Sequence, residues 1–125
     1  MPQAHFFHGA RHEVSTFVSG AGRDGVRGYL DGMQKPDRAK MLALLHRAGD
    51  HGPPFNNPER CRMLKGEELN EFKTSGHRIT WVFVGDRILL LTAFSKNQNS
   101  TPPQELERAR GALASVRAER HGGNP

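Results

Sequence analysis

The sequence contains one cysteine, one tryptophan and one tyrosine among its 125 residues, and it has no long apolar run. A lone cysteine, Cys61, cannot form an internal disulfide, so nothing here requires an oxidising compartment, and we interpret Cys61 as a packing residue. The longest apolar stretch, Ile88–Leu91, is far too short to span a bilayer. Met1–Gly9 also lacks the basic and apolar segments of a signal peptide. We therefore expect a cytoplasmic protein with no membrane partner.

The charge that is present is mostly positive. Eighteen Lys and Arg residues against thirteen Asp and Glu residues give a net charge of +5. This excess favours polyanionic partners such as nucleic acid or an acidic protein, although it also describes an ordinary solvated basic surface. The chain length predicts one compact domain over residues 1–125, with mobile ends at residues 121–125.

Hydrophobic periodicity predicts a mixture of helices and strands. Apolar residues between Phe6 and Val18 could supply a first strand, and residues 26–33 have helical spacing. A second helix begins at Pro36 and presents the apolar stripe Met41, Leu44, Leu45 and Ala48. The three prolines of Pro53–Pro58 predict a loop. A last helix begins after Thr101, and it presents the apolar stripe Leu106, Ala109, Leu113 and Val116.

The clearest strand signal is a hairpin in the second half of the chain. Residues alternate in character over His77–Val84, and Gly85-Asp86 matches a type II′ turn into Arg87–Ser95. One face of this sheet is predicted to form the core surface, and its residues are Phe72, Ile79, Trp81, Phe83, Ile88 and Leu90.

A basic pair is predicted on the other face of the sheet, which we expect to be accessible. If Ser75-Gly76 is a two-residue turn, Lys73 lies opposite Arg78, and Ala93 and Ser95 share their face. Like charges directly opposite each other destabilise a sheet, so this pair needs compensation. A bound phosphate or the neighbouring Glu71 would supply it, and the pattern alone does not decide between the two.

Further basic residues surround this face. Arg60, Arg62 and Lys65 precede it in the chain and Lys96 follows the last strand, so together they could line a groove or simply be solvated. The sequence shows no cluster with metal-ligand spacing, and the pair His5-x-x-His8 is too weak a pattern to define a metal site. We therefore predict no metal and no cofactor.

An ordered set of motifs resembles the HigB-like, phage-associated branch of the RelE toxin superfamily. The resemblance covers roughly residues 26–118, and residues 1–25 match poorly. Its specificity lies in the following pieces: Leu64-Lys65-Gly66, Leu69-Asn70-Glu71-Phe72-Lys73, His77-Arg78-Ile79-Thr80-Trp81-Val82-Phe83, Ile88-Leu89-Leu90-Leu91, Phe94-Ser95-Lys96, Thr101-Pro102 and Glu105-Leu106-Glu107-Arg108-Ala109.

The resemblance implies an α+β fold, a twisted antiparallel sheet with two N-terminal helices on one face and a C-terminal helix. It also implies a toxin that binds in the ribosomal decoding site and cleaves mRNA, and that a helix-turn-helix antitoxin neutralises. The implied reaction needs no metal. The ribose 2′-hydroxyl attacks the adjacent phosphate, which requires a base, cations for the growing charge and an acid for the leaving oxygen.

Carried onto this chain, the resemblance implies catalytic roles for Arg78, Lys73 and Lys96. Arg78 would grip the phosphate oxygens, Lys73 would share that work or activate the 2′-hydroxyl, and Lys96 would hold phosphate or assist proton transfer. His77 titrates near neutrality and is a possible acid or base. RNA contacts are implied for Lys65, Arg62, Arg60 and Ser95.

The general base is not identified, because the superfamily in part uses a Tyr or His near the C-terminus. Here the single tyrosine, Tyr29, lies in an N-terminal helix. Two rival functions remain: a non-catalytic RNA- or partner-binding protein on the same scaffold, and a structural phage protein whose basic face meets another protein.

Overall fold

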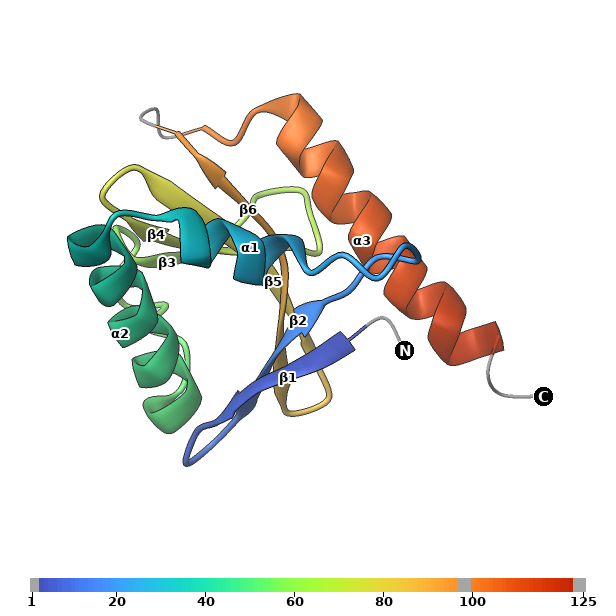
Figure 1. Cartoon of the computed structure of the whole chain (residues 1–125), viewed down its shortest axis with the longest axis horizontal. Helices are drawn as coiled ribbons and strands as arrows, with labels where there is room; N and C mark the ends of the chain where they lie inside the picture. The colour runs from blue at the N-terminus through green and yellow to red at the C-terminus, as the bar shows by residue number, and fades with distance from the viewer. Residues whose placement is uncertain (1–2, 97–99, 123–125) are drawn as a thin grey trace.

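The fold is given by a computed structural model, which describes residues 3–96 and 100–122. In this part of the chain a six-stranded sheet runs in the order β1-β2-β6-β5-β4-β3, and three helices accompany it (Figure 1). In chain order the elements are β1 (Gln3–His8), β2 (Glu13–Phe17), α1 (Gly25–Gly32), α2 (Lys35–His51), β3 (Cys61–Met63), β4 (Asn70–Thr74), β5 (His77–Val84), β6 (Arg87–Ser95) and α3 (Pro103–Gly122). This α+β architecture is consistent with a RelE-like fold.

The sheet is mixed, so the expectation of a purely antiparallel sheet is wrong at one junction. Strand β2 pairs with β6 in parallel, with Val14 opposite Ile88, whereas the other neighbouring strands are antiparallel. A parallel pair needs a long crossover, and α1, α2 and strands β3 to β5 supply it here. The N-terminal hairpin thereby extends the sheet beyond the region that the motifs covered.

The segment 1–25, which matched the resemblance poorly, supplies two strands rather than the single one expected. Strand β1 forms one edge of the sheet, and β2 joins it to the central strand β6. At the other end of the chain, residues 121 and 122 of the predicted mobile tail are the last residues of α3. The remainder of that tail, residues 123–125, lies outside the described residues.

The two faces of the sheet carry separate cores. Helices α1 and α2 pack on one face, which we call the α1/α2 face, where their side chains meet Phe72, Ile79 and Trp81. The predicted stripe of α2 is buried there. Helix α3 packs on the opposite face, the α3 face, where its stripe meets Val82 and Leu89. Figure 1 shows α2 and α3 on opposite sides of the strands.

Both predicted two-residue turns are confirmed. Ser75 and Gly76 both have positive φ, 44° and 81°, as a type I′ turn requires. Gly85 has φ of 61° while Asp86 has no positive φ, which agrees with a type II′ turn. The register between β4 and β5 therefore places Lys73 opposite Arg78, as predicted.

An irregularity in β6 changes which of its later residues share a face with Arg78. Thr80 pairs with Thr92 and Trp81 pairs with Leu90, so Leu91 is an extra residue that has no counterpart in β5. One inserted residue reverses the alternation that follows it. Phe94, rather than the predicted Ala93, lies opposite Arg78, and Ala93 belongs to the α1/α2 core.

The predicted core surface is confirmed for five of its six residues. Phe72, Ile79, Trp81, Ile88 and Leu90 are buried, but Phe83 is 41% exposed beside the edge of the Trp81 ring. Cys61 is buried in the same core, as a packing residue should be. No helix formed by residues 3–96 and 100–122 combines the length and the apolar character needed to cross a membrane.

Candidate functional site

A group of charged side chains lies on the α3 face at the end of the sheet where β3, β4 and β5 meet. The strand register puts Arg62 opposite Glu71 and Lys73 opposite Arg78. Residues two apart on a strand share a face, so all four side chains lie together. With Thr101, which precedes α3, they form what we call the Glu71 cluster.

Glu71 is the centre of this cluster. Its carboxylate is fully buried, and its Oε1 atom accepts hydrogen bonds from Nε and Nη2 of Arg62 at 3.2 and 3.1 Å. The same oxygen accepts from Nη1 of Arg78 at 3.1 Å. The Oε2 atom accepts from the Thr101 hydroxyl at 2.8 Å. A buried carboxylate must be paired, and two guanidinium groups and a hydroxyl fulfil that requirement here.

Arg78 does not lie on an open surface, so the expectation of an accessible basic pair is wrong for this residue. Only 4% of Arg78 is exposed, and its guanidinium is paired with Glu71. Of the two compensations that the sequence left open, the structure contains the one by Glu71. The physical reason is that Arg62, from the third strand, and Arg78 can both reach one carboxylate between them.

Lys73 is the member of the cluster that keeps an available charge. It is half-buried, and within the described residues its ammonium group forms no ion pair. Burial lowers the pKa of Lys73, and the positive charges of Arg62 and Arg78 lower the pKa further. A lysine in such a place binds an anion readily and also gives up its proton more easily than an exposed lysine.

The other predicted basic residues do not all join this cluster. Lys65 is exposed in the β3–β4 connection and shares a hollow with Arg62 and Thr101. Arg60 is exposed, and it lines a different hollow with Lys40 and Arg47 of α2. The lysine after the last strand, Lys96, is half-buried.

Lys96 is placed at the end of the sheet by its backbone. Its amide N–H donates to the carbonyl of Gly76 at 2.6 Å, which joins it to the β4–β5 turn. Within the described residues its side chain forms no ion pair. Lys96 therefore stands beside the turn that follows Lys73.

His77 and Ser95 lie on the α1/α2 face, so the prediction that Ser95 shares the face of Arg78 is wrong. The two residues pair across β5 and β6, one position beyond Arg78 and Phe94. His77 Nδ1 lies 2.6 Å from the Tyr29 hydroxyl, and its Nε2 lies 3.3 Å from Oδ2 of Asp37. Since a carboxylate only accepts, Nε2 donates to Asp37, whereas the direction of the bond between Nδ1 and the Tyr29 hydroxyl depends on the protonation of the ring.

We call Tyr29, Asp37, His77 and Ser95 the His77 cluster. Burial raises the pKa of Tyr29, and the nearby Asp37 charge also raises this pKa, whereas a hydrogen bond with Ser95 lowers it. The cluster joins α1 and α2 to the strand end next to Lys96. A chain of hydrogen bonds from carboxylate to imidazole to phenol can transfer or store a proton.

Sequence reasoning missed most of this arrangement. Thr101 was predicted only to precede the last helix, but its hydroxyl donates to Glu71. Tyr29 and Asp37 were not expected near the site, because they come from helices on the other face. The available signal was Glu71 itself, the acidic residue between the paired cations on the polar face.

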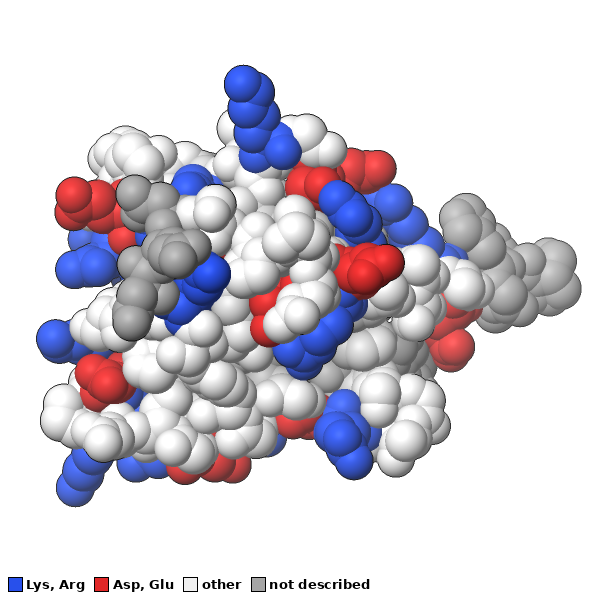
Figure 2. Space-filling view, turned by 90° about the horizontal axis from the view of Figure 1, so that it is seen from above, with Lys and Arg blue, Asp and Glu red and all other residues white. Residues whose placement is uncertain are grey.

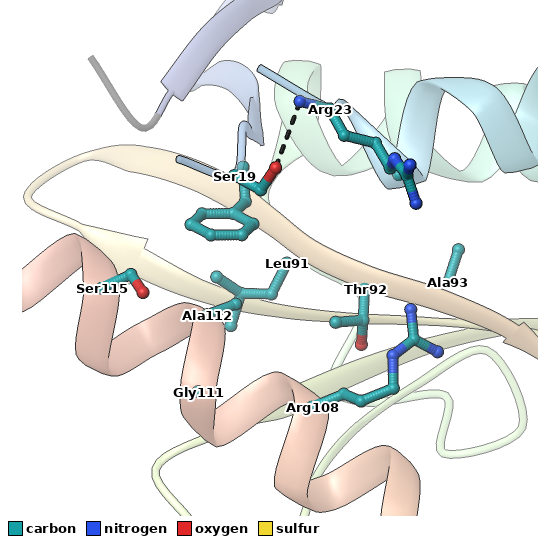
Figure 3. A pocket seen from close by; sticks show the side chains of 11 residues that line it. Ser19, Arg23, Leu91, Thr92, Ala93, Arg108, Gly111, Ala112 and Ser115 are labelled. Atoms are coloured by element: carbon teal, nitrogen blue, oxygen red, sulfur yellow. Dashed lines mark hydrogen bonds between the residues drawn. The ribbon is translucent and has the colours of Figure 1, made fainter. Parts of the chain in front are cut away.

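A hollow with basic sides lies elsewhere on the α3 face, between β6, α3 and the segment before α1. Figure 3 shows Arg23 and Arg108 on opposite sides of it, with Leu91 and Ala112 at its floor. Arg108 also pairs with Glu105 at 2.7 Å. The sequence did not predict this hollow, since its walls come from three distant segments.

On the face of the molecule that Figure 2 shows, the positive charge is not gathered into one basic surface. Figure 2 shows Lys and Arg side chains interspersed with Asp and Glu side chains on the face seen from above. The local geometry around Lys73, rather than a broad basic surface on this face, therefore favours an anionic partner.

The fold and the motifs agree with the class of RelE-like toxins. A family model described as phage-derived Gp49-like protein (DUF891) matches residues 28–114, and the chain belongs to this family. The family is part of the RelE/HigB-like toxin superfamily and is associated with toxin–antitoxin systems. A comparison with curated proteins gave no match.

Proposed function

We propose that this protein is the toxin of a type II toxin–antitoxin system, and that it acts in the cytoplasm as an endoribonuclease on mRNA bound to the ribosome. Membership of a toxin–antitoxin-associated family supports the class. The observation that supports the activity is Lys73, an ammonium group without an ion pair within the described residues, held beside two arginines. Within the superfamily, the motifs favour the HigB-like branch.

The proposed reaction is attack of the ribose 2′-hydroxyl on the adjacent phosphate, which leaves a cyclic phosphate and a 5′-hydroxyl. It proceeds without a catalytic metal, because lysine and arginine side chains provide the charge that opposes the growing negative charge on the phosphate. Lys73 contacts the phosphate or, in its neutral form, removes the proton of the 2′-hydroxyl. Its lowered pKa suits the second role.

Arg78 lies opposite Lys73 on the neighbouring strand and is buried, so it acts indirectly. Its guanidinium is committed to Glu71, so we assign it the role of fixing the position of the cluster and adding positive potential, in place of a direct grip on phosphate. Lys65 and Arg62, which line one hollow, contact the RNA chain on one side of Lys73. Lys96 holds phosphate at the turn end of the sheet.

His77 is the candidate acid or base at the same end. It reaches the leaving oxygen only if the RNA crosses the strand end from the α3 face to the α1/α2 face. In that path Asp37 and Tyr29 orient the imidazole through hydrogen bonds to its two nitrogens. Arg60 and Ser95 contact RNA only along this same path, since neither joins the Glu71 cluster.

The decisive test is the pair Lys73→Met and Lys73→Arg, with Lys40→Met as the control. Lys40 is an exposed lysine of α2. Induced expression of the wild type should arrest growth, Lys73→Met should abolish the arrest and Lys40→Met should retain it. Mapping of mRNA ends should find new 5′-hydroxyl ends in cells that express the wild type but not in cells that express Lys73→Met. Lys73→Arg separates the roles, because it preserves a charge but does not lose a proton near neutral pH.

Two outcomes would contradict this proposal. Equal toxicity of wild type and Lys73→Met would remove Lys73 from the mechanism. Growth arrest without new mRNA ends would favour the alternative function, a non-catalytic RNA- or partner-binding protein on the same scaffold. Arg78→Ala is a poorer probe, since it also disturbs the pairing of the buried Glu71.

A cognate helix-turn-helix antitoxin is the expected protein partner. The hollow between Arg23 and Arg108, with its apolar floor, suits an acidic amphipathic segment of that partner. The neighbouring gene should encode such a protein, and its co-expression should restore growth. The double variant Arg23→Glu/Arg108→Glu should stay toxic but escape neutralisation; if it is neutralised as fully as the wild type, the antitoxin binds elsewhere.

A further inference from the structure

We propose that His5, His8 and Glu13 form a binding site for a divalent transition metal of the zinc class, at the edge of the sheet formed by β1 and β2. This proposal is independent of the ribonuclease proposal, because none of the three residues belongs to the Glu71 cluster or the His77 cluster. The nitrogen and oxygen atoms of these three side chains lie within 4.8 Å of one another.

A bulge in β1 brings the two histidines together. Three residues apart on a regular strand, they would point to opposite faces. However, His5 pairs with Ser15 while Phe7 pairs with Val14, so Phe6 is an extra residue. His8 then pairs with Glu13. Since Glu13 and Ser15 share a face, the two histidines opposite them share it as well.

The contacts within this group are close. His5 Nδ1 lies 2.9 Å from Oε2 of Glu13, and the rings of His5 and His8 have centroids 4.5 Å apart. Both histidines are exposed, so neither is held by core packing, and small rotations of the rings can bring three donor atoms around one ion. The bulge therefore presents a convergent set of ligands.

The chemistry of the three ligands selects the ion. Two imidazole nitrogens and one carboxylate oxygen are a ligand set that zinc accepts with a fourth position left open. A hydrogen bond from His5 is the main cause that lowers the pKa of Glu13, so the carboxylate is ionised at neutral pH. Calcium and magnesium prefer oxygen ligands throughout, so this set disfavours them.

Other groups near Glu13 do not occupy the site. The Ser15 hydroxyl donates to Oε2 at 3.3 Å, and Arg87 Nε lies 3.9 Å from the same oxygen. The guanidinium of Arg87 donates through Nη1 to Gln3 at 2.7 Å. The positive charge of Arg87 opposes a second cation, and we therefore expect moderate rather than very tight affinity.

A simple ion pair between His5 and Glu13 would explain their short distance without a metal. His8 distinguishes the two interpretations, because the ion pair does not use it. If a metal binds, His8 is a ligand and its loss must weaken binding.

The test is zinc binding by the full-length chain without a histidine tag, measured by isothermal titration calorimetry with zinc chloride. We expect one ion per chain for the wild type. His8→Ala should weaken binding by more than the roughly 10- to 100-fold that loss of an outer partner of a metal site causes. His51→Ala, which removes another exposed histidine at the end of α2, should bind like the wild type.

Two further measurements complete the test. Acidification to about pH 5.5 should weaken wild-type binding, because protons compete with the metal for its ligand atoms. In nuclear magnetic resonance spectra, zinc should shift the imidazole signals of His5 and His8 but leave that of His51 unchanged. Circular dichroism of His8→Ala controls for folding. Absence of binding, or equal binding by wild type and His8→Ala, would overturn the proposal.

Discussion

The two faces of the six-stranded sheet differ in the kind of side chain that they bury. On the α1/α2 face, Phe72 stacks on Trp81 with ring centroids 4.8 Å apart, and the surrounding side chains form a continuous apolar core. On the α3 face the apolar core stops short, and the end of the sheet holds the buried charge of Glu71. We infer that the α1/α2 face contributes mainly to stability. The α3 face contributes less apolar burial at this end of the sheet, but its buried carboxylate holds two arginines in fixed positions.

The largest effect should come from the apolar face. Trp81→Ala removes a fully buried ring and should lower the free energy of unfolding by about 3–5 kcal/mol. Phe83→Ala removes a neighbouring ring that is 41% exposed, so its cost should be much smaller. Urea denaturation of both variants measures this difference. Similar losses would show that the deep burial of Trp81 in the α1/α2 core is not what determines its contribution to stability.

A smaller but still large effect should come from the charged face. Glu71→Gln preserves the shape of the side chain but removes the charge that Arg62 and Arg78 share, and breaking a buried ion pair costs about 3 kcal/mol or more. The control is Glu68→Gln, which removes an exposed pair with Arg117 and should change stability little. If the two variants unfold at the same urea concentration, the Glu71 cluster does not hold this face together.

The smallest effect is a difference in the response of the two faces to alkaline pH. Burial raises the pKa of the Cys61 thiol on the α1/α2 face from 9.0 to about 12. Above pH 9 the unfolded chain loses this proton while the folded chain keeps it, so stability falls, by at most about 1.4 kcal/mol per pH unit. The contribution of Lys73 to stability changes with pH in the opposite direction. Its pKa is lowered, so below the ordinary lysine value the unfolded chain binds more protons, and stability rises with pH.

Unfolding measured at several pH values for the wild type, Cys61→Ala and Lys73→Met separates these contributions. Cys61→Ala should reduce the loss of stability above pH 9, and Lys73→Met should remove a gain. Slopes are compared instead of absolute values, because either substitution also changes packing. If the free energy of unfolding changed with pH by the same slope in all three proteins, folding would shift the pKa of neither Cys61 nor Lys73.

The sequence predicts much of the fold because turns and apolar periodicity are local. Ser75-Gly76 and Gly85-Asp86 fix two hairpins through their backbone preferences alone, and the register that places Lys73 opposite Arg78 follows from the first turn. The extra residue Leu91 is different. Nothing in an apolar run distinguishes a bulge from regular alternation, so the faces of Ala93 and Ser95 were assigned wrongly.

The candidate site was less predictable because its contacts are distant in the chain. The alternation of side chains along β4 and β5 showed that Glu71, Lys73 and Arg78 share a face. It did not show which cation would form an ion pair with the carboxylate. Tyr29 meets His77 only because α1 packs across the strand end, which depends on the whole tertiary structure. Pairing preferences of this kind have no signature in local sequence.

The parallel pairing of β2 with β6 has a consequence for synthesis of the protein. Val14 leaves the exit tunnel long before its partner Ile88 in β6 is translated. The edge of β2 that faces β6 therefore has no partner strand until β6 has been translated, although β1 can already pair with the other edge. A chain released early would lack β6, the strand that joins β2 to β5, and we expect that such a fragment would not fold.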